Sequence, residues 1–128
     1  MRPEPEERKQ VKPKLALLSA WAFWACVCAI LVLSLAPSST PMPSTGWDKS
    51  NHALAFAVLA FLAHKAWPGR MWLLPSLLAY GALIEILQSF TPDRYAEWSD
   101  LWADGFGLLV GEMFARLTRW LAHRQAGR

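Results

Sequence analysis

Residues 15–36 read LALLSAWAFWACVCAILVLSLA, a run of 22 residues without a formal charge. Crossing a bilayer core of roughly 30 Å takes about 20 helical residues, so this run is long enough for one transmembrane span. A cleaved signal peptide is the alternative interpretation, but the apolar core of a signal peptide is usually only about 7–15 residues long. The length of the run therefore favours a retained membrane helix.

Three further apolar segments follow this run, at about residues 50–67, 71–90 and 100–120. The segment at 50–67 is the least continuous of the three, because polar residues interrupt it near both ends. His64 and Lys65 stand near its C-terminal end, where we expect both side chains to be cytoplasmic and solvated.

Hydrophobic residues make up 54% of the chain and charged residues 18%. An average soluble domain has about 45–50% apolar and about 25% charged residues. The composition and the four apolar segments predict an all-α fold, a four-transmembrane-helix bundle over residues 15–122. We expect residues 1–14 to be a disordered cytoplasmic tail and residues 123–128 to be a short basic C-terminal tail.

Lys and Arg residues are distributed unequally about the four predicted spans. An even number of spans places both termini on one side of the membrane, and 11 of the 13 basic residues fall on that side. They are Arg2, Arg8, Lys9, Lys12, Lys14, Lys65, Arg70, Arg116, Arg119, Arg124 and Arg128. By the positive-inside rule, we predict a multi-pass protein of the cytoplasmic membrane with both termini cytoplasmic.

The net charge of +3 does not indicate a nucleic-acid partner, because the basic residues flank apolar runs and form no interleaved basic and aromatic face.

Cys26 and Cys28 are two residues apart, so they point to different sides of a helix and predict neither a disulfide nor a metal site. The sequence has no Walker loop, HExxH motif or GxSxG motif, so ATP-driven transport and the familiar hydrolase mechanisms lack support.

Polar residues gather at the predicted outer ends of three spans. They are Asp48, Lys49 and His52 before and in the second span, Glu85 and Gln88 in the third, Arg94 in the following loop, and Asp100 and Asp104 in the fourth. An ionised side chain at the centre of a membrane costs about 2.5–3.5 kcal/mol, so we expect these groups to face inward, where they pair or line a wet cleft. Arg94 can bridge a carboxylate bidentately, and Lys49 can supply a second cation.

The last segment carries a stripe of small residues, Ala103, Gly107 and Gly111, at intervals of four. Such stripes allow close approach of membrane helices. Asp100 and Asp104 share roughly this face, so we expect the two carboxylates to point into the bundle.

Three motifs in this order, DKSNHALAF, EILQSFTPDR and SDLWADGFGLLVG, resemble the VanZ-like family of small bacterial membrane proteins over about residues 15–120. The matching positions are Asp48, Lys49 and His52; Glu85, Gln88, Phe90, Pro92 and Arg94; and Asp100, Gly107 and Gly111. Asp104 departs from the pattern, because the family usually has Asn at this position. The founding member is associated with low-level resistance to teicoplanin, a glycopeptide that acts on cell-wall precursors outside the cytoplasmic membrane. The resemblance therefore implies an envelope role at the outer face.

Three functions remain open at this stage. The first is binding of a charged headgroup, from a membrane lipid or a lipid-linked cell-wall precursor, with an effect on glycopeptide susceptibility. The second is an enzyme acting on a lipid-linked substrate, and the third is a structural or assembly protein with a polar clasp between helices. The candidate catalytic residues are His52, Glu85 and Asp100, and the candidate ligand-binding residues are Asp48, Lys49, Gln88, Arg94 and Asp104.

Metal ligands are present among these residues, since His52, Glu85, Asp100 and Asp104 offer suitable donor atoms. Their spacing along the chain is not compact, so the sequence predicts no metal and no organic cofactor.

Four spans are few for a transporter unless the protein oligomerises, and the four predicted spans are compatible with a homo-oligomer.

Overall fold

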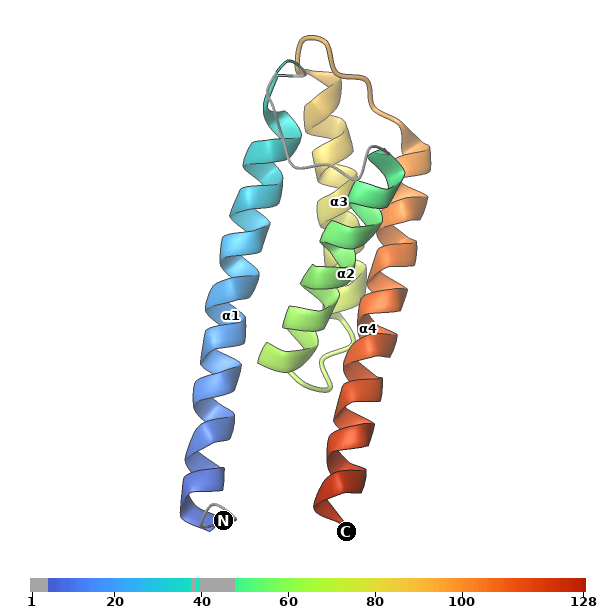
Figure 1. The fold of residues 1–128 in the computed structure, drawn as a ribbon. Helices are drawn as coiled ribbons and strands as arrows, with labels where there is room; N and C mark the ends of the chain where they lie inside the picture. The colour runs from blue at the N-terminus through green and yellow to red at the C-terminus, as the bar shows by residue number, and fades with distance from the viewer. Residues whose placement is uncertain (1–4, 38, 40–47) are drawn as a thin grey trace.

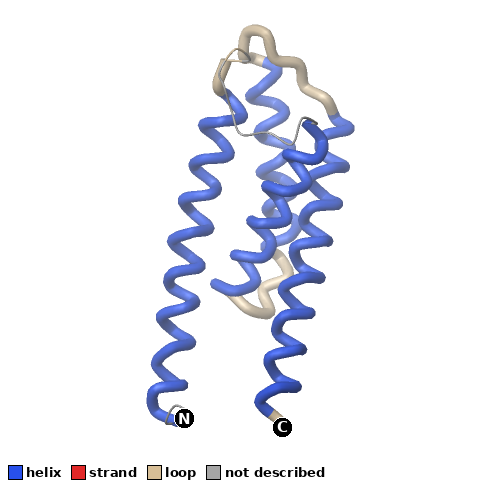
Figure 2. Tube along the Cα trace, viewed as in Figure 1, coloured by secondary structure: helices blue, strands red, loops and turns tan. Residues whose placement is uncertain are grey.

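The computed structural model describes residues 5–37, 39 and 48–128, with side chains described from Pro13 onward except that of Asp48. Four helices form the fold, and no strand occurs among these residues (Figure 2). They are α1 (Pro5–Leu35), α2 (Asp48–Ala66), α3 (Leu73–Ser89) and α4 (Trp98–Ala126). The start of α1 and the end of α4 lie at one end of the bundle, and the α3–α4 loop lies at the other (Figure 1). We call these the terminal end and the loop end.

The four helices coincide with the four predicted segments, which confirms the all-α prediction. Helix α1 is longer than expected, because residues 5–14 are helical where we expected a disordered tail. These residues are mostly Glu, Arg, Lys and Gln, which favour helix, and Pro5 stands at the first helical position, where proline is well tolerated. Helix α4 likewise continues to Ala126, so most of the basic C-terminal tail is helical.

One helix in the described part of the chain, α1 from Pro13 to Leu35, is long and apolar enough to cross a membrane by length and composition. Helix α3 is a shorter apolar helix. The prediction of four helices is therefore confirmed, while length and composition alone support a membrane span only for α1 among the described helices.

Helices α2 and α4 form the closest contact in the bundle. A Cβ atom added at Gly107 would overlap the backbone of Ala53, and one added at Gly111 would overlap the backbone of Ala57. The small-residue stripe of α4 therefore lies directly on the backbone of α2, as its sequence pattern predicts.

The apolar core lies between α1, α2, α3 and α4 and includes Phe23, Phe56, Leu59, Leu77, Ile84 and Leu108. Large hydrophobic side chains are also exposed on every helix, among them those of Trp21, Leu54, Leu83 and Phe106. Conversely, five polar or charged residues are buried: Glu85, Gln88, Asp100, Asp104 and Glu112. The bundle thus exposes apolar side chains and buries carboxylates, the reverse of the usual arrangement in a soluble protein.

Side chains from α3 and the loop after it attach the end of α1. Gln88 Nε2 donates to the Ser34 carbonyl at 2.9 Å, and Arg94 donates from Nε and Nη2 to the Ala36 carbonyl at 3.2 and 2.7 Å. The last carbonyls of a helix have no partner within the helix, so these donors satisfy groups that would otherwise lack one. Asp93 in this loop has φ 62°, a left-handed conformation that Asp tolerates well and that immediately precedes Arg94.

The variant Gly111→Ala tests the contact between α2 and α4. Its methyl group would overlap the Ala57 backbone, so the helices must separate, and we expect a loss of about 1–3 kcal/mol in the free energy of unfolding. Circular dichroism during thermal unfolding in detergent measures this change. Gly105→Ala is the matched control, because its Cβ would meet only Leu78 Cδ1 at 3.8 Å and alanine favours helix by about 1 kcal/mol. Equal melting temperatures for both variants would contradict the close contact.

The variant Arg94→Ala tests the attachment of α1. Removing both hydrogen bonds to the Ala36 carbonyl should let the last turn of α1 open more often, so its amides should exchange faster with deuterium. Hydrogen exchange read by mass spectrometry over residues 30–36 measures this, with the exposed Arg119→Ala as control. Unchanged exchange in Arg94→Ala would show that the guanidinium does not hold this helix end.

Candidate functional site

His52 lies at the centre of a cluster of three buried carboxylates at the loop end of the bundle. Helix α2 supplies His52, α3 supplies Glu85, and α4 supplies Asp100 and Asp104. We call Glu85, Asp100 and Asp104 the carboxylate cluster. The close contact of α2 with α4 places the first turns of both helices side by side, so residues 52 and 104 meet although they are far apart in sequence.

Each ring nitrogen of His52 faces one carboxylate of α4. Nδ1 lies 3.0 Å from Asp104 Oδ1, within hydrogen-bond distance, and Nε2 lies 3.6 Å from Asp100 Oδ2. Asp104 is only 1% exposed. Gly81 on α3 makes room for it, because a Cβ atom at Gly81 would lie 2.6 Å from Asp104 Oδ2. The absence of a side chain at Gly81 therefore allows a carboxylate to be buried there.

Glu85 is fully buried, with 0% exposure. Its Oε2 accepts a hydrogen bond from the Glu97 backbone N–H at 3.0 Å. Its Oε1 is also buried and has no hydrogen-bond partner among the described residues. One ligand atom from each of Glu85, His52 and Asp100 lies within 4.8 Å of the other two, so the fold brings metal-ligand types together that the sequence separates.

Lys49 forms the outer edge of the cluster. Its Nζ donates to Asp100 Oδ1 at 3.4 Å and to Glu97 Oε2 at 3.3 Å. The hydrogen bond to Glu97 is the main reason why the pKa of Lys49 is raised above its ordinary value, and the charge of Asp100 acts in the same direction. Lys49 therefore stays charged at neutral pH. Glu97 was not singled out in the sequence, because it precedes the apolar segment of α4 by several residues.

A cavity of about 270 Å³ lies beside His52, between α1, α2 and α3, and we call it the His52 cavity. Its polar lining comes from Ser34, Asn51, His52, Gln88 and Arg94. Its apolar lining comes from Ile30, Leu33, Leu54, Ala55, Phe56 and Ile84. None of the three residues of the carboxylate cluster lines it, so they stand behind His52 as seen from the cavity.

The predicted site residues thus divide into two groups. His52, Glu85, Asp100, Asp104 and Lys49 come together in and around the carboxylate cluster, as expected from their helix ends. The other two described residues, Gln88 and Arg94, line the His52 cavity and bind α1 carbonyls. Among the described residues Arg94 does not form the expected bidentate pairing with a carboxylate, and its Nε and Nη2 donate to the Ala36 carbonyl instead. The side chain of Asp48 lies outside the described residues.

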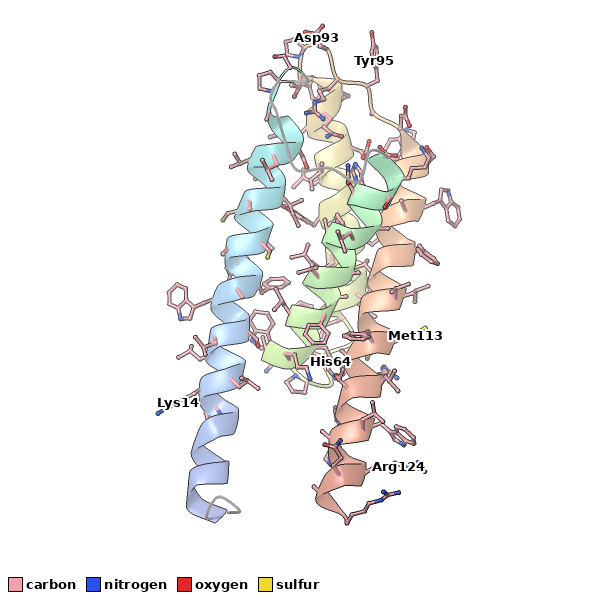
Figure 3. All side chains as sticks on the ribbon, in the orientation of Figure 1. Lys14, His64, Asp93, Tyr95, Met113 and Arg124 are labelled. Atoms are coloured by element: carbon pink, nitrogen blue, oxygen red, sulfur yellow. The ribbon has the colours of Figure 1, made fainter. Side chains whose placement is uncertain are left out.

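A second polar cluster, which we did not predict from the sequence, lies toward the terminal end. His64, labelled in Figure 3, is only 9% exposed at its side chain, so it is not solvated as we expected. Its Nδ1 lies 3.2 Å from Glu112 Oε1, which also accepts from Arg116 Nε at 2.7 Å. Glu112 and Arg116 are four residues apart, and this spacing of opposite charges on one helix face is the signal that the sequence offered.

A larger cavity of about 430 Å³ lies near the same end, between α1, α3 and the loop before α3. Aromatic side chains dominate its lining: Phe23, Trp24, Trp67, Trp72 and Tyr80. Arg70 is the charged residue of this aromatic cavity, so the two cavities each pair an apolar wall with one arginine.

The residues that build the carboxylate cluster and the His52 cavity lie in a part of the chain that matches a known protein family. The family model described as VanZ/LLP1 matches residues 10–119, a range that contains α2, α3 and every residue of the cluster. No curated protein and no solved structure matches the chain. The match covers far more than half of the 128 residues, and the chain therefore belongs to the VanZ/LLP1 family.

Proposed function

We propose that this VanZ-like protein crosses the cytoplasmic membrane four times, with both termini cytoplasmic, and binds the anionic headgroup of an envelope lipid or lipid-linked cell-wall precursor. The observation that carries the proposal is the His52 cavity, which combines a polar end containing Arg94 with an apolar wall. The ligand would reach it at the outer face of the membrane.

The distribution of side chains supports insertion of the whole bundle. Apolar side chains are exposed on all four helices, as expected for a surface in contact with lipid. Helix α4 has a composition too polar for a simple span because it carries Asp100, Asp104 and Glu112, but all three are buried against other helices. The cost of placing charge in lipid is therefore avoided by packing, and the excess of Lys and Arg at the terminal end supports a cytoplasmic location of that end.

Arg94 provides the chemistry for an anionic headgroup. A guanidinium has five N–H donors, and the Ala36 carbonyl accepts from two of its nitrogens, so further donors remain for a phosphate or carboxylate. His52, Asn51 and Gln88 line the same cavity. Because the carboxylates stand behind His52 and outside the lining, the charged group that meets the ligand directly is a cation.

The apolar wall of the cavity suits the first part of a lipid chain. Leu33 on α1 and Leu54 on α2 line the cavity and are exposed, so its mouth lies between these two helices. The volume of about 270 Å³ is near the lower end of the roughly 300–1,000 Å³ typical of ligand pockets. A headgroup fits inside, while the remaining chain would extend past Leu33 and Leu54 into the bilayer.

Binding is better supported than acid–base catalysis. Both ring nitrogens of His52 face carboxylates, and neither Glu85 nor Asp100 lines the cavity. The candidate catalytic groups therefore do not present a free donor or acceptor to a bound headgroup. A protein that holds a cell-wall precursor at the outer face is placed to change glycopeptide susceptibility, so that role remains part of the proposal.

Cysteine labelling tests the orientation. With Cys26 and Cys28 replaced by alanine, Tyr95→Cys in the α3–α4 loop should react with a membrane-impermeant maleimide in intact cells. Gly127→Cys at the end of α4 should react only after the cells are opened. Both positions are exposed, and the side chains of Tyr95 and Arg124 show the two ends concerned (Figure 3). Labelling of Gly127→Cys alone in intact cells would reverse the proposed orientation.

Lipid binding tests the function of the His52 cavity. Native mass spectrometry of the detergent-purified protein should show retention of undecaprenyl phosphate or phosphatidylglycerol in preference to zwitterionic phosphatidylethanolamine. Arg94→Lys should weaken this retention by about tenfold or more, because loss of a hydrogen bond to a charged group costs about 1.5–3 kcal/mol. Ala55→Phe should weaken it as well by filling the cavity.

Arg70→Lys is the matched control, since Arg70 lines the aromatic cavity at the other end. A similar loss in Arg94→Lys and Arg70→Lys would argue against a specific site. Release of a shortened or headgroup-free lipid during incubation, abolished by His52→Gln with the melting temperature unchanged, would favour the enzyme hypothesis instead.

A further inference from the structure

We propose that His52, Glu85 and Asp100 form a binding site for a divalent transition-metal ion such as Zn²⁺ or Mn²⁺, with Asp104 as the positioning residue of the imidazole. This site lies behind the His52 cavity, and the reasons for proposing it do not rest on the proposed lipid ligand. The argument rests on the charge of the cluster, the hydrogen bonding of His52 and the unpartnered oxygen of Glu85.

Three carboxylates form the cluster, and Lys49 is the one Lys or Arg side chain among the described residues that contacts them. Lys49 contacts Asp100 through one carboxylate oxygen and divides its donors between Asp100 and the exposed Glu97. Glu85 and Asp104, the two most deeply buried members, have no Lys or Arg partner among the described side chains. Buried charges are normally paired or coordinate a metal, so the surplus of carboxylates calls for a cation at this place.

The hydrogen bonding of His52 leaves one nitrogen in the position of a metal ligand. In the tautomer with its proton on Nδ1, His52 donates to Asp104 Oδ1 at 3.0 Å. Nε2 then carries a free lone pair, on the side of the ring that faces Asp100 Oδ2 at 3.6 Å. Metal-binding histidines usually donate the N–H of their second ring nitrogen to a carboxylate, a backbone carbonyl or water, which fixes the tautomer and the ring orientation. Asp104 supplies that carboxylate.

Glu85 supplies the independent sign of a ligand. Its side chain is completely buried, one oxygen is used by the Glu97 N–H, and the other has no partner in the described part of the chain. An unpaired carboxylate oxygen inside a protein is costly, and a metal ion would satisfy it. The ligand atoms of Glu85, His52 and Asp100 already lie within 4.8 Å of one another.

The donor set indicates the class of ion. One imidazole nitrogen and two carboxylates suit Zn²⁺ or Mn²⁺ better than Ca²⁺ or Mg²⁺, which prefer oxygen alone. Zn²⁺ ligands lie about 2.0–2.2 Å from the metal, so the three groups would move inward by a small side-chain rotation on binding. Lys49 and Glu97 are partly exposed at the outer edge, which gives the ion a route from the loop end.

Isothermal titration calorimetry tests this site with Zn²⁺ and Mn²⁺ chlorides as the probes, added to the full chain purified in detergent after treatment with EDTA. The wild-type protein should bind one of these ions saturably with one ion per chain. Glu85→Gln and Asp100→Asn should each weaken binding by about tenfold or more, a loss at least equal to that caused by changes around a metal site. Gln at position 85 keeps an oxygen that can accept from the Glu97 N–H, so the fold should be retained, and thermal unfolding checks this.

Glu112→Gln is the matched control, because Glu112 is also buried and also faces a histidine, but lies toward the other end of the bundle. It should leave the affinity unchanged. Absence of saturable binding of both ions, or equal losses in Glu85→Gln and Glu112→Gln, would overturn the metal site. Retention of anionic lipid measured in EDTA separates the two proposals: if retention persists while metal binding is absent, only the metal inference fails.

Discussion

The contact between α2 and α4 is the constraint on which the rest of the structure depends. Two glycines of α4 lie against the backbone of α2 at Ala53 and Ala57, with no space for a side chain between them. Within a membrane, helix association relies on such close packing, since lipid is as apolar as the helix surfaces. The contact begins one residue after His52 and three residues after Asp104, so it also sets the distance across which these two side chains meet.

A buried carboxylate cluster in an apolar bundle requires both space and partners. Gly81 supplies the space, because any side chain there would collide with Asp104. His52, Lys49 and the Glu97 N–H supply partners for part of the acidic surface. Asp104 Oδ1 lies 3.0 Å from His52 Nδ1 and can accept a hydrogen bond from the Nδ1–H. The carboxylate adds a negative charge, which strengthens the case for a cation in this chain.

The sequence predicted the helices from the length of its apolar segments, and it predicted the cluster from the cost of placing charge in lipid. In a four-span bundle, Glu85, Asp100 and Asp104 are expected to face inward, and their helix ends are expected to meet at one depth. The partner of Arg94 could not be predicted, since the free carbonyl at the end of α1 leaves no mark in the sequence. The buried pairing of His64 with Glu112 was missed for a related reason: a histidine near a span end is usually solvated, and only the register of α2 against α4 shows that it is not.

His52 connects the carboxylate cluster to the cavity, because one residue forms a wall of both. An anionic headgroup in the cavity and the carboxylates behind His52 would repel each other through a low-dielectric interior that screens charge weakly. A divalent cation in the cluster would reduce this repulsion, so the two proposed ligands should assist each other, and by thermodynamic linkage each should raise the affinity for the other by the same factor. Arg94 then lies on the cavity side of His52, where an anionic headgroup would reach it. The carboxylates lie on the far side of His52, where a metal cation would reach them.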